Sequence, residues 1–339
     1  MTTIGKNLGQ VTQPQSRPEV QPPPEKKPAP AQAAPQNTAQ GDAFATSSAK
    51  KGPSLNGVGQ GPVVGNTGGN PGLDGVDGAK GATYGRIPGG TPFVAGDGDS
   101  NPISPNDISQ GALGDCYLMS SLATMAQQNP DAIKNMIHGP DKDGTYTVTL
   151  YDKKPFWQPW GDDFSKVEVK VTPDLPLKDG NPVFAQALDQ QGSQREIWPA
   201  LVEKAYAQHF GGNNYHSIEG GWGNEAMEHL TGKASSTANP KDMSFEQLQK
   251  MVSDGKGITL GSLNDAKLGP IDLPDSHDHN ELYKNGTLIC NHEYFVTGVD
   301  PKTKEVIVHN PWGWDRGDIR IPFDKFQGAF RQVSTNPLH

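Results

Sequence analysis

The 339-residue chain holds only two cysteines, which allow at most one disulfide and exclude a disulfide-stabilised scaffold. It has no hydrophobic run long enough to cross a membrane, and its N-terminus lacks the apolar segment of a secretory signal. Its net charge of −9 argues against a general binder of nucleic acid or of anionic membranes. We therefore expect a protein that is cytoplasmic or is exported without a cleavable signal peptide.

Large apolar residues are scarce in residues 1–100, which are rich in Pro, Gln, Ala and Gly. Such a segment buries too little surface to offset the entropy of ordering, so we predict a disordered arm. Between Gly69 and Gly81 a glycine recurs at every third position, which indicates a flexible spacer. Residues 101–339 are long enough for one domain with a substantial core. A polar arm before such a domain favours a leaderless secreted effector.

The most informative segment is residues 110–116, Gln-Gly-Ala-Leu-Gly-Asp-Cys. Apolar residues recur at helical spacing after Cys116, and the glycines before it indicate irregular backbone. A thiol at a helix start meets unpaired N–H groups and the positive end of the helix dipole, which favour the thiolate. Gln110 offers an amide donor to an oxygen that gains negative charge. The segment predicts half of a cysteine-nucleophile site, although Cys116 alone also fits a buried structural residue.

A base for Cys116 is offered by a predicted hairpin with strands at residues 290–299 and 304–309. Centring its turn pairs residues whose numbers sum to about 602, which places His292 opposite Asn310. Histidine can take the thiol proton and return it to a leaving amine, while asparagine holds the ring in the useful tautomer. Together, Cys116, His292 and Asn310 predict nucleophilic thiol chemistry. A one-residue error in the turn would separate the pair.

At this point the chain resembles a calpain-type cysteine protease catalytic domain, of the bacterial style and without EF-hand domains. Tyr117 stands where that family more usually has a tryptophan. Residues 110–116 are similar to the family's oxyanion and nucleophile motif, and residues 197–206 are similar to its central helix. Residues 217–232 are similar to its linking segment, and His292 with residues 310–313 to its histidine and asparagine motifs. The resemblance runs from about residue 101 to about residue 333.

The resemblance implies an α+β, papain-like fold of two lobes. A helical lobe at residues 101–220 would carry Cys116, and a β lobe at residues 221–339 would carry His292 and Asn310. Substrate would bind between the lobes. The implied activity is cleavage of protein or peptide substrates by a monomeric endopeptidase, with no nucleic-acid partner and no membrane span.

The resemblance also implies the role of each site residue. Cys116 would attack the peptide carbonyl, His292 would act as base and then acid, and Asn310 would orient the imidazole. Gln110 would stabilise the oxyanion. Apart from the resemblance, two roles stay open for Trp312: shielding the His–Asn hydrogen bond from water, or packing as an ordinary core tryptophan. Strand alternation places Glu293 on the face opposite His292, as a structural residue.

Calpains bind calcium in the protease core, but the ligand positions here depart from the family pattern. Asp107 matches one ligand position. His216 stands where an acidic residue is expected, and Arg316 replaces another acid. Imidazole is a poor ligand for a hard, oxygen-seeking cation. We therefore expect no cofactor and no need for calcium.

Two other interpretations stay open. His277, His279, Cys290 and His292 have the side chains of a zinc site, which would make the protein a metal-stabilised binding module. That interpretation leaves residues 110–116 unexplained. Alternatively, a papain-like fold can be a catalytically silent scaffold or can transfer acyl groups. The presence of all three catalytic residue types disfavours a silent scaffold.

Overall fold

The computed structural model describes residues 69–96, 101–155, 163–186, 190–264, 267–268, 271–272 and 280–339. Of the predicted arm at residues 1–100, residues 1–68 and 97–100 lie outside the described residues, as do His277 and His279. Helices and strands are mixed along the described part, which confirms the predicted α+β class. None of the described helices is long and apolar enough to cross a membrane.

A first hydrophobic core, hereafter the first core, gathers buried residues between Val76 and Leu230, together with Phe295 and Leu338. Its helices are α1 (Cys116–Gln128), α2 (Pro130–Met136), α3 (Trp198–His209) and α4 (Gly223–Thr231), with 3-10 turns η1 (Asp77–Ala79), η2 (Pro105–Asp107) and η3 (His216–Ile218). Its three small sheets are β1 (Thr83–Arg86) with β6 (Asp174–Lys178) and β7 (Asn181–Pro182), β2 (Gly90–Thr91) with β9 (Gln194–Glu196) and β8 (Gln190–Gln191), and β3 (Ile137–His138) with β4 (Tyr146–Lys153) and β5 (Phe164–Val171).

The second core gathers buried residues between Met243 and Val333 around a six-stranded antiparallel sheet. In spatial order, its strands are β10 (Ser236–Ala238), β17 (Phe330–Asn336), β11 (Gly257–Ser262), β14 (Glu293–Asp300), β15 (Glu305–His309) and β16 (Ile319–Pro322). The remaining elements of this part are α5 (Phe245–Ser253), α6 (Glu281–Lys284), α7 (Phe323–Ala329), η4 (Pro240–Asp242), η6 (Trp314–Arg316), and the pair β12 (Lys267–Leu268) and β13 (Ile271–Asp272).

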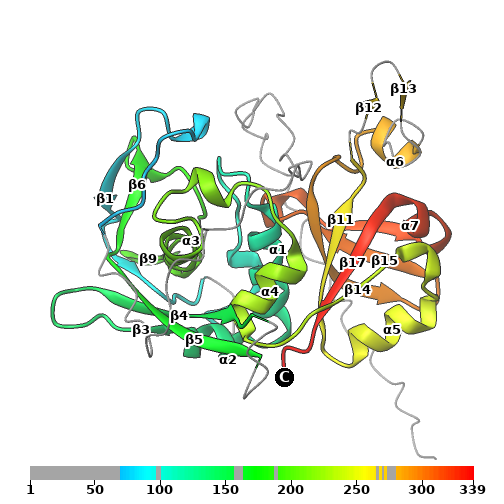
Figure 1. The fold of residues 1–339 in the computed structure, drawn as a ribbon, viewed down its shortest axis with the longest axis horizontal. Coiled ribbons are helices and arrows are strands. Elements are labelled where there is room, and N and C mark those ends of the chain that lie inside the picture. Colours follow the sequence, from blue (N-terminus) through cyan, green and yellow to red (C-terminus); the bar gives the residue numbers. More distant parts are fainter. Residues whose placement is uncertain are drawn as a thin grey trace, which may run out of the picture. The chain divides into compact units, whose positions relative to one another are not determined.

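Helix α1 lies between the two cores (Figure 1). Every residue from Cys116 to Ala126 is buried, because α4 and η2 pack on one side and β11 and β14 on the other. Two of its hydroxyl side chains bond to the sheet: Ser120 donates to the Glu293 carbonyl at 3.0 Å, and Thr124 accepts from the Ile258 N–H at 3.1 Å. A polar group on a fully buried helix needs such partners.

Local sequence signals fix several of these elements. Helix α1 begins at Cys116, and Pro199 lies in the first turn of α3, where its missing N–H costs nothing. A capping box starts α5. Ser244 Oγ accepts from the Gln247 N–H at 3.2 Å, and Gln247 Oε1 accepts from the Ser244 N–H at 2.7 Å.

The predicted boundary between the lobes needs correction. Helix α4 lies beyond residue 220, yet Ala226 and Leu230 are buried in the first core. The part around the first core is also not mostly helical, since β4 and β5 form a hairpin that α3 and α4 cover. A boundary drawn from motifs missed this, because burial depends on which face of α4 meets α1.

The predicted disordered spacer is wrong for residues 69–96. Val76 and Ala79 are buried in the first core, and β1 pairs with β6. Two of the repeated glycines mark close contacts: Gly72 forms a β-bridge with Asn214, and Gly78 lies directly on Ala112. A Cβ atom at Gly78 would overlap that of Ala112. These two glycines therefore report packing rather than flexibility.

Asn70 binds a buried cation from the same segment. The ammonium of Lys204 is held by Asn70 Oδ1 at 2.6 Å, the Asp174 carbonyl at 2.7 Å, and the carbonyl and hydroxyl oxygens of Thr172, each at 2.9 Å. Burial lowers the pKa of Lys204 to about 8. Four oxygens offset part of the cost of burying the charge, and one of them comes from the segment predicted to be disordered.

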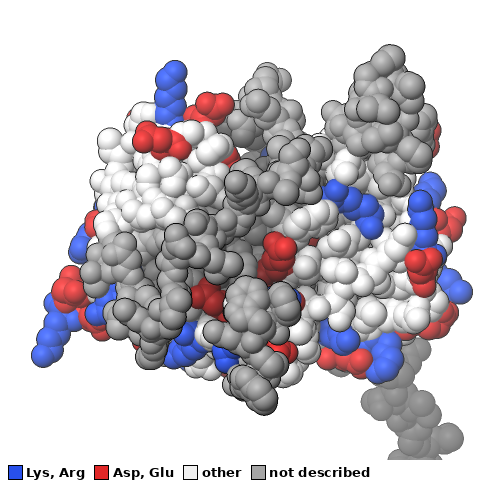
Figure 2. Space-filling view, viewed as in Figure 1, with Lys and Arg blue, Asp and Glu red and all other residues white. Residues whose placement is uncertain are grey.

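Basic and acidic side chains are interspersed on the surface. Figure 2 shows Lys and Arg beside Asp and Glu at the edge of the part around the second core. Arg320 pairs with Asp300 at 2.7 Å and with Glu305 at 3.0 Å. Such exposed pairs contribute little to stability but keep the surface free of a single-sign field at these positions.

Replacing Gly78 by alanine tests whether the glycine segment is packed. We expect Gly78→Ala to lower the free energy of unfolding by about 1–3 kcal/mol, because the new methyl group collides with Ala112. Gly69→Ala is the matched control, since a Cβ atom there meets nothing within 4 Å. Urea unfolding of both variants measures the difference. Equal stabilities would contradict the packing of this segment.

Candidate active site

Cys116 occupies the first position of α1 and is 2% exposed. The carbonyl of Asp115 accepts from the N–H groups of Leu118 and Met119 at 2.8 and 3.1 Å, which starts the helix. The N–H groups of the first turn have no partner within a helix. The thiol therefore stands where the helix dipole favours a negative charge, as the sequence predicts.

The loop before Cys116 is held from two sides. Gly111 lies against the carbonyls of Val183 and Phe184, so close that no side chain would fit. The Gln110 side-chain amide donates to the Leu113 carbonyl at 2.7 Å, and the Gln110 N–H donates to the Pro311 carbonyl at 2.8 Å. These bonds join the Cys116 loop to the segment that carries Asn310.

His292 and Asn310 are hydrogen-bonded, with His292 Nε2 2.9 Å from Asn310 Oδ1. The same Oδ1 accepts from the Trp312 N–H at 3.1 Å. A backbone N–H can only donate, so this contact identifies the oxygen of the amide. His292 Nε2 must then carry the proton, and Nδ1 is the nitrogen with a basic lone pair. That is the tautomer able to accept a proton from a thiol.

The predicted strand register is wrong, although the predicted pair forms. Phe295 pairs with His309, and Asp300 pairs with Glu305, so the register differs from the predicted one. A bulge near Thr297 adds a residue to β14. His292 precedes β14, and Asn310 follows β15. Their side chains meet because the chain turns back after β15, not because they are cross-strand neighbours.

The loop after Asn310 packs around the imidazole. The Trp312 ring centroid lies 5.1 Å from that of His292, and the Trp312 carbonyl accepts from the Ser109 hydroxyl at 3.3 Å. His309 supports the loop from the other side, with Nε2 3.3 Å from the Gly313 carbonyl. Sequence reasoning missed Ser109 and His309, because each is an ordinary polar residue at the end of an element.

Packing of α1 on β14 brings the two halves of the site together. Ser120, one turn after Cys116, bonds to the carbonyl of Glu293, next to His292. The ring centroid of Tyr294 lies 4.9 Å from that of His292. The described residues thus place Gln110, Cys116, His292 and Asn310 at the junction of the two cores.

Residues 99–319 match the family described as calpain family cysteine protease. The chain belongs to the calpain family of cysteine proteases. It is 32% identical to the calpain-1 catalytic subunit of Mus musculus over 218 residues, which cover 61% of this chain and 27% of that protein. It is 30% identical to calpain clp-1 of Caenorhabditis elegans over 214 residues, 61% of this chain and 25% of that protein. The chain thus spans about a quarter of the length of these curated relatives.

The residues at the expected calpain calcium position do not fit a cation site. Asp107 is fully buried, and its carboxylate accepts from the Ser104 N–H at 2.7 Å, the Ser104 hydroxyl at 2.8 Å and Trp198 Nε1 at 3.1 Å. Asp107 therefore caps η2 and anchors the start of α3. His216 instead pairs with Glu219, with His216 Nδ1 2.6 Å from the carboxylate. The Asp107 carboxylate is already held by protein donors, and the His216 imidazole has no oxygen to offer calcium.

The zinc interpretation gains no support from the geometry. His292 directs Nε2 to Asn310, and the side-chain nitrogen of Asn291 lies 4.0 Å from the half-buried Cys290 sulfur. His277 and His279 lie outside the described residues. Within the described ranges, no three His, Cys, Asp or Glu side chains are grouped to hold a metal.

Two buried acids beneath the site were missed by sequence reasoning. Asp115 is fully buried. Its carboxyl lies near that of Glu203 in α3, whose Oε1 accepts from the Ala185 N–H at 3.0 Å. Burial raises the pKa of Glu203 above its usual range and so favours its neutral, protonated form.

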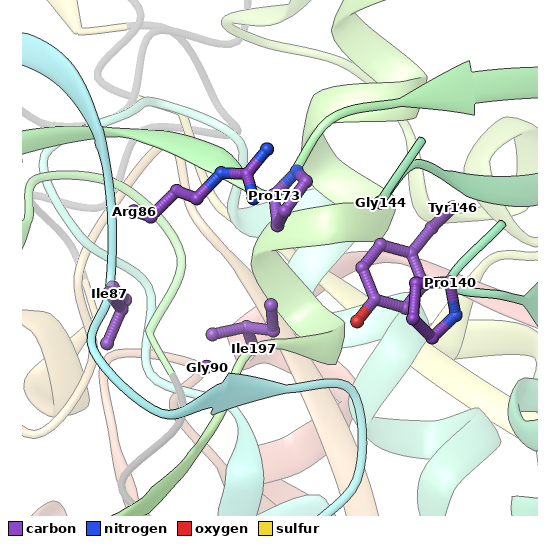
Figure 3. Close-up of a pocket in the computed structure, with 8 residues that line it drawn as sticks. All are labelled: Arg86, Ile87, Gly90, Pro140, Gly144, Tyr146, Pro173 and Ile197. Carbon is purple, nitrogen blue, oxygen red and sulfur yellow. The ribbon is translucent and has the colours of Figure 1, made fainter. Parts of the chain in front are cut away.

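A cavity of about 190 Å³ lies in the part around the first core, apart from these residues. Figure 3 shows Arg86 at one side of it and the Tyr146 hydroxyl pointing toward Ile197. Arg86 is paired with Asp174 at 3.2 Å. None of the candidate site residues lines the cavity, and we assign it no function.

The Glu203 carboxyl predicts a pH dependence of stability. Because its folded pKa is raised, its contribution is complete below the unfolded pKa and is lost as pH rises through the folded pKa. We expect Glu203→Gln to remove this loss, so that the variant melts above wild type at alkaline pH. Thermal melts between about pH 5 and pH 9 measure it, with exposed Glu168→Gln as control. Parallel curves for wild type and Glu203→Gln would contradict the raised pKa of Glu203.

Proposed function

We propose that this chain is a cysteine endopeptidase with a papain-like, two-lobed catalytic domain. The hydrogen bond between His292 Nε2 and Asn310 Oδ1 carries the proposal, because it fixes the tautomer that a thiol protease needs. Because β14, which follows His292, packs on α1, the imidazole has Cys116 as a nucleophile to activate. Membership of the calpain family supports the same reaction.

The reaction begins with transfer of the Cys116 thiol proton to His292 Nδ1. The thiolate attacks the peptide carbonyl carbon and forms a tetrahedral intermediate. The Gln110 amide and the Cys116 N–H donate to its oxyanion. As the C–N bond breaks, His292 returns the proton to the leaving amine, and a thioester remains. Water, deprotonated by His292, then hydrolyses the thioester and restores the thiol.

Supporting groups keep the imidazole in this role. Asn310 holds Nε2–H in place, and Trp312 covers the pair on one side, which strengthens a hydrogen bond by excluding water. The Gln110 amide has two N–H groups, and the bond to Leu113 uses one of them. The second N–H is the donor for the oxyanion.

We infer that the domain works without calcium. Family members use calcium to align the two lobes, whereas here direct bonds already join the two cores. These include Gln110 N–H to Pro311 at 2.8 Å and Ser120 to Glu293 at 3.0 Å. The commitments of Asp107 and His216 support the same conclusion. Substrates are proposed to be protein segments that enter the junction in extended form.

Replacing Cys116 tests the peptidase directly. Wild type is expected to cleave casein in reducing buffer, and Cys116→Ala should lose at least about a thousandfold in rate, since no other nucleophile replaces the thiolate. Cys290→Ala is the matched control and should keep its activity. Gel electrophoresis of timed digests measures the cleavage. Equal cleavage by the Cys116 variant would assign the activity elsewhere, and no cleavage by wild type with or without calcium would favour a scaffold.

Chelation tests the independence from calcium. We expect the same casein cleavage rate within about twofold in excess EGTA and in millimolar calcium, because Asp107 and His216 are committed to protein partners. Full inhibition by EGTA that added calcium reverses would refute this expectation. An activity lost in EGTA but not restored would instead indicate an effect of the chelator itself.

A further inference from the structure

One buried acid has no place in the proposed hydrolysis. Glu293 directly follows His292 at the start of β14, and its side chain is 1% exposed. Strand alternation explains why it points away from His292, but not why an acid is buried there. Burying a carboxylate is costly unless its charge is stabilised, so the contacts of Glu293 indicate its role.

Elements packed in both cores hold Glu293. Its Oε1 accepts from the Thr259 hydroxyl of β11 at 2.6 Å, and its carbonyl accepts from Ser120 of α1 at 3.0 Å. Gly223, the first residue of α4, lies directly against the carboxylate. A Cβ atom at Gly223 would overlap both Oε1 and the Thr259 hydroxyl. Glycine therefore lets the start of α4 approach the carboxylate.

The charges around Glu293 favour its ionised form. The positive end of the α4 dipole faces the carboxylate, and the Arg331 guanidinium of β17 acts on it as well. Ser120 of α1 and Thr259 of β11 do not titrate, and His292 directly precedes Glu293 in the chain. Burial opposes these effects and raises the pKa of Glu293 to about 7. Its Oε2 is buried and accepts no hydrogen bond from the residues that the structure describes.

We propose that Glu293 is a positioning residue that clamps the start of α4 to β11 and β14, and that its ionisation sets the alignment of His292 with Cys116. The proposal rests on the proposed peptidase function. With the carboxylate ionised, Gly223, Thr259 and Arg331 all attract it, and the cores stay in register. Protonation removes the attraction of Arg331 and of the helix dipole, and the clamp loosens.

The test compares wild type with Glu293→Gln, which keeps the size and an oxygen acceptor but removes the charge. The wild-type kcat/KM for casein, divided by that of the variant, is measured across about pH 5.5 to 8.5. We expect this ratio to be about tenfold at high pH and close to one at low pH, with a midpoint near neutral. The reason is that protonated Glu293 resembles glutamine.

Glu196→Gln is the matched control, because Glu196 is also buried but accepts from the Val94 N–H beside the first core. The wild-type kcat/KM divided by that of Glu196→Gln should not change with pH. The rate at which iodoacetamide alkylates Cys116, followed by peptide mass mapping, is measured in parallel and needs no peptide hydrolysis. We expect the alkylation rate of wild type, divided by that of Glu293→Gln, to change with pH in the same way as the ratio of kcat/KM.

These two readouts separate the clamp from the peptidase. A wild type that cleaves nothing overturns the proposed function, and the alkylation ratio then decides the clamp. An alkylation ratio that is constant with pH overturns the clamp. So does a Glu196→Gln variant that shows the same pH dependence as Glu293→Gln.

Discussion

The structure depends on the burial of α1 between two hydrophobic cores. A helix enclosed on every side must satisfy each of its polar side chains from its neighbours. Ser120 and Thr124 do so through β14 and β11, and these bonds fasten one core to the other. The same enclosure holds the start of the helix, with Cys116, beside the strand that follows His292. The packing of α1 therefore also fixes the position of the Cys116 thiol.

Buried ionisable side chains are a second feature that holds the structure together. Lys204 is surrounded by four uncharged oxygens, Asp107 accepts from three donors, and Glu203 accepts from the Ala185 N–H. Each group is stabilised by neutral partners, and each joins segments that are distant in the sequence. Such groups add little net stability, because desolvation offsets the attraction, but they specify one arrangement.

Close backbone contacts are a third feature that holds the structure together. Gly78, Gly111 and Gly223 each stand where a side chain would collide with a neighbouring segment. They bring the N-terminal segment onto the Cys116 loop, that loop onto residues 183–184, and α4 onto Glu293. The glycines are spread along the chain, yet all three serve the surroundings of the candidate site.

The sequence by itself determined the local elements and the residue types of the site. Helix α1 starts at Cys116 and the α5 capping box forms, because caps and periodicity act over a few residues. The tertiary structure alone decided the register of β14 and β15, the packing of residues 69–96 and the burial of Asp115 and Glu293. A bulge, a close glycine contact and the burial of an acid all depend on partners far along the chain. No local pattern encodes where those partners will lie.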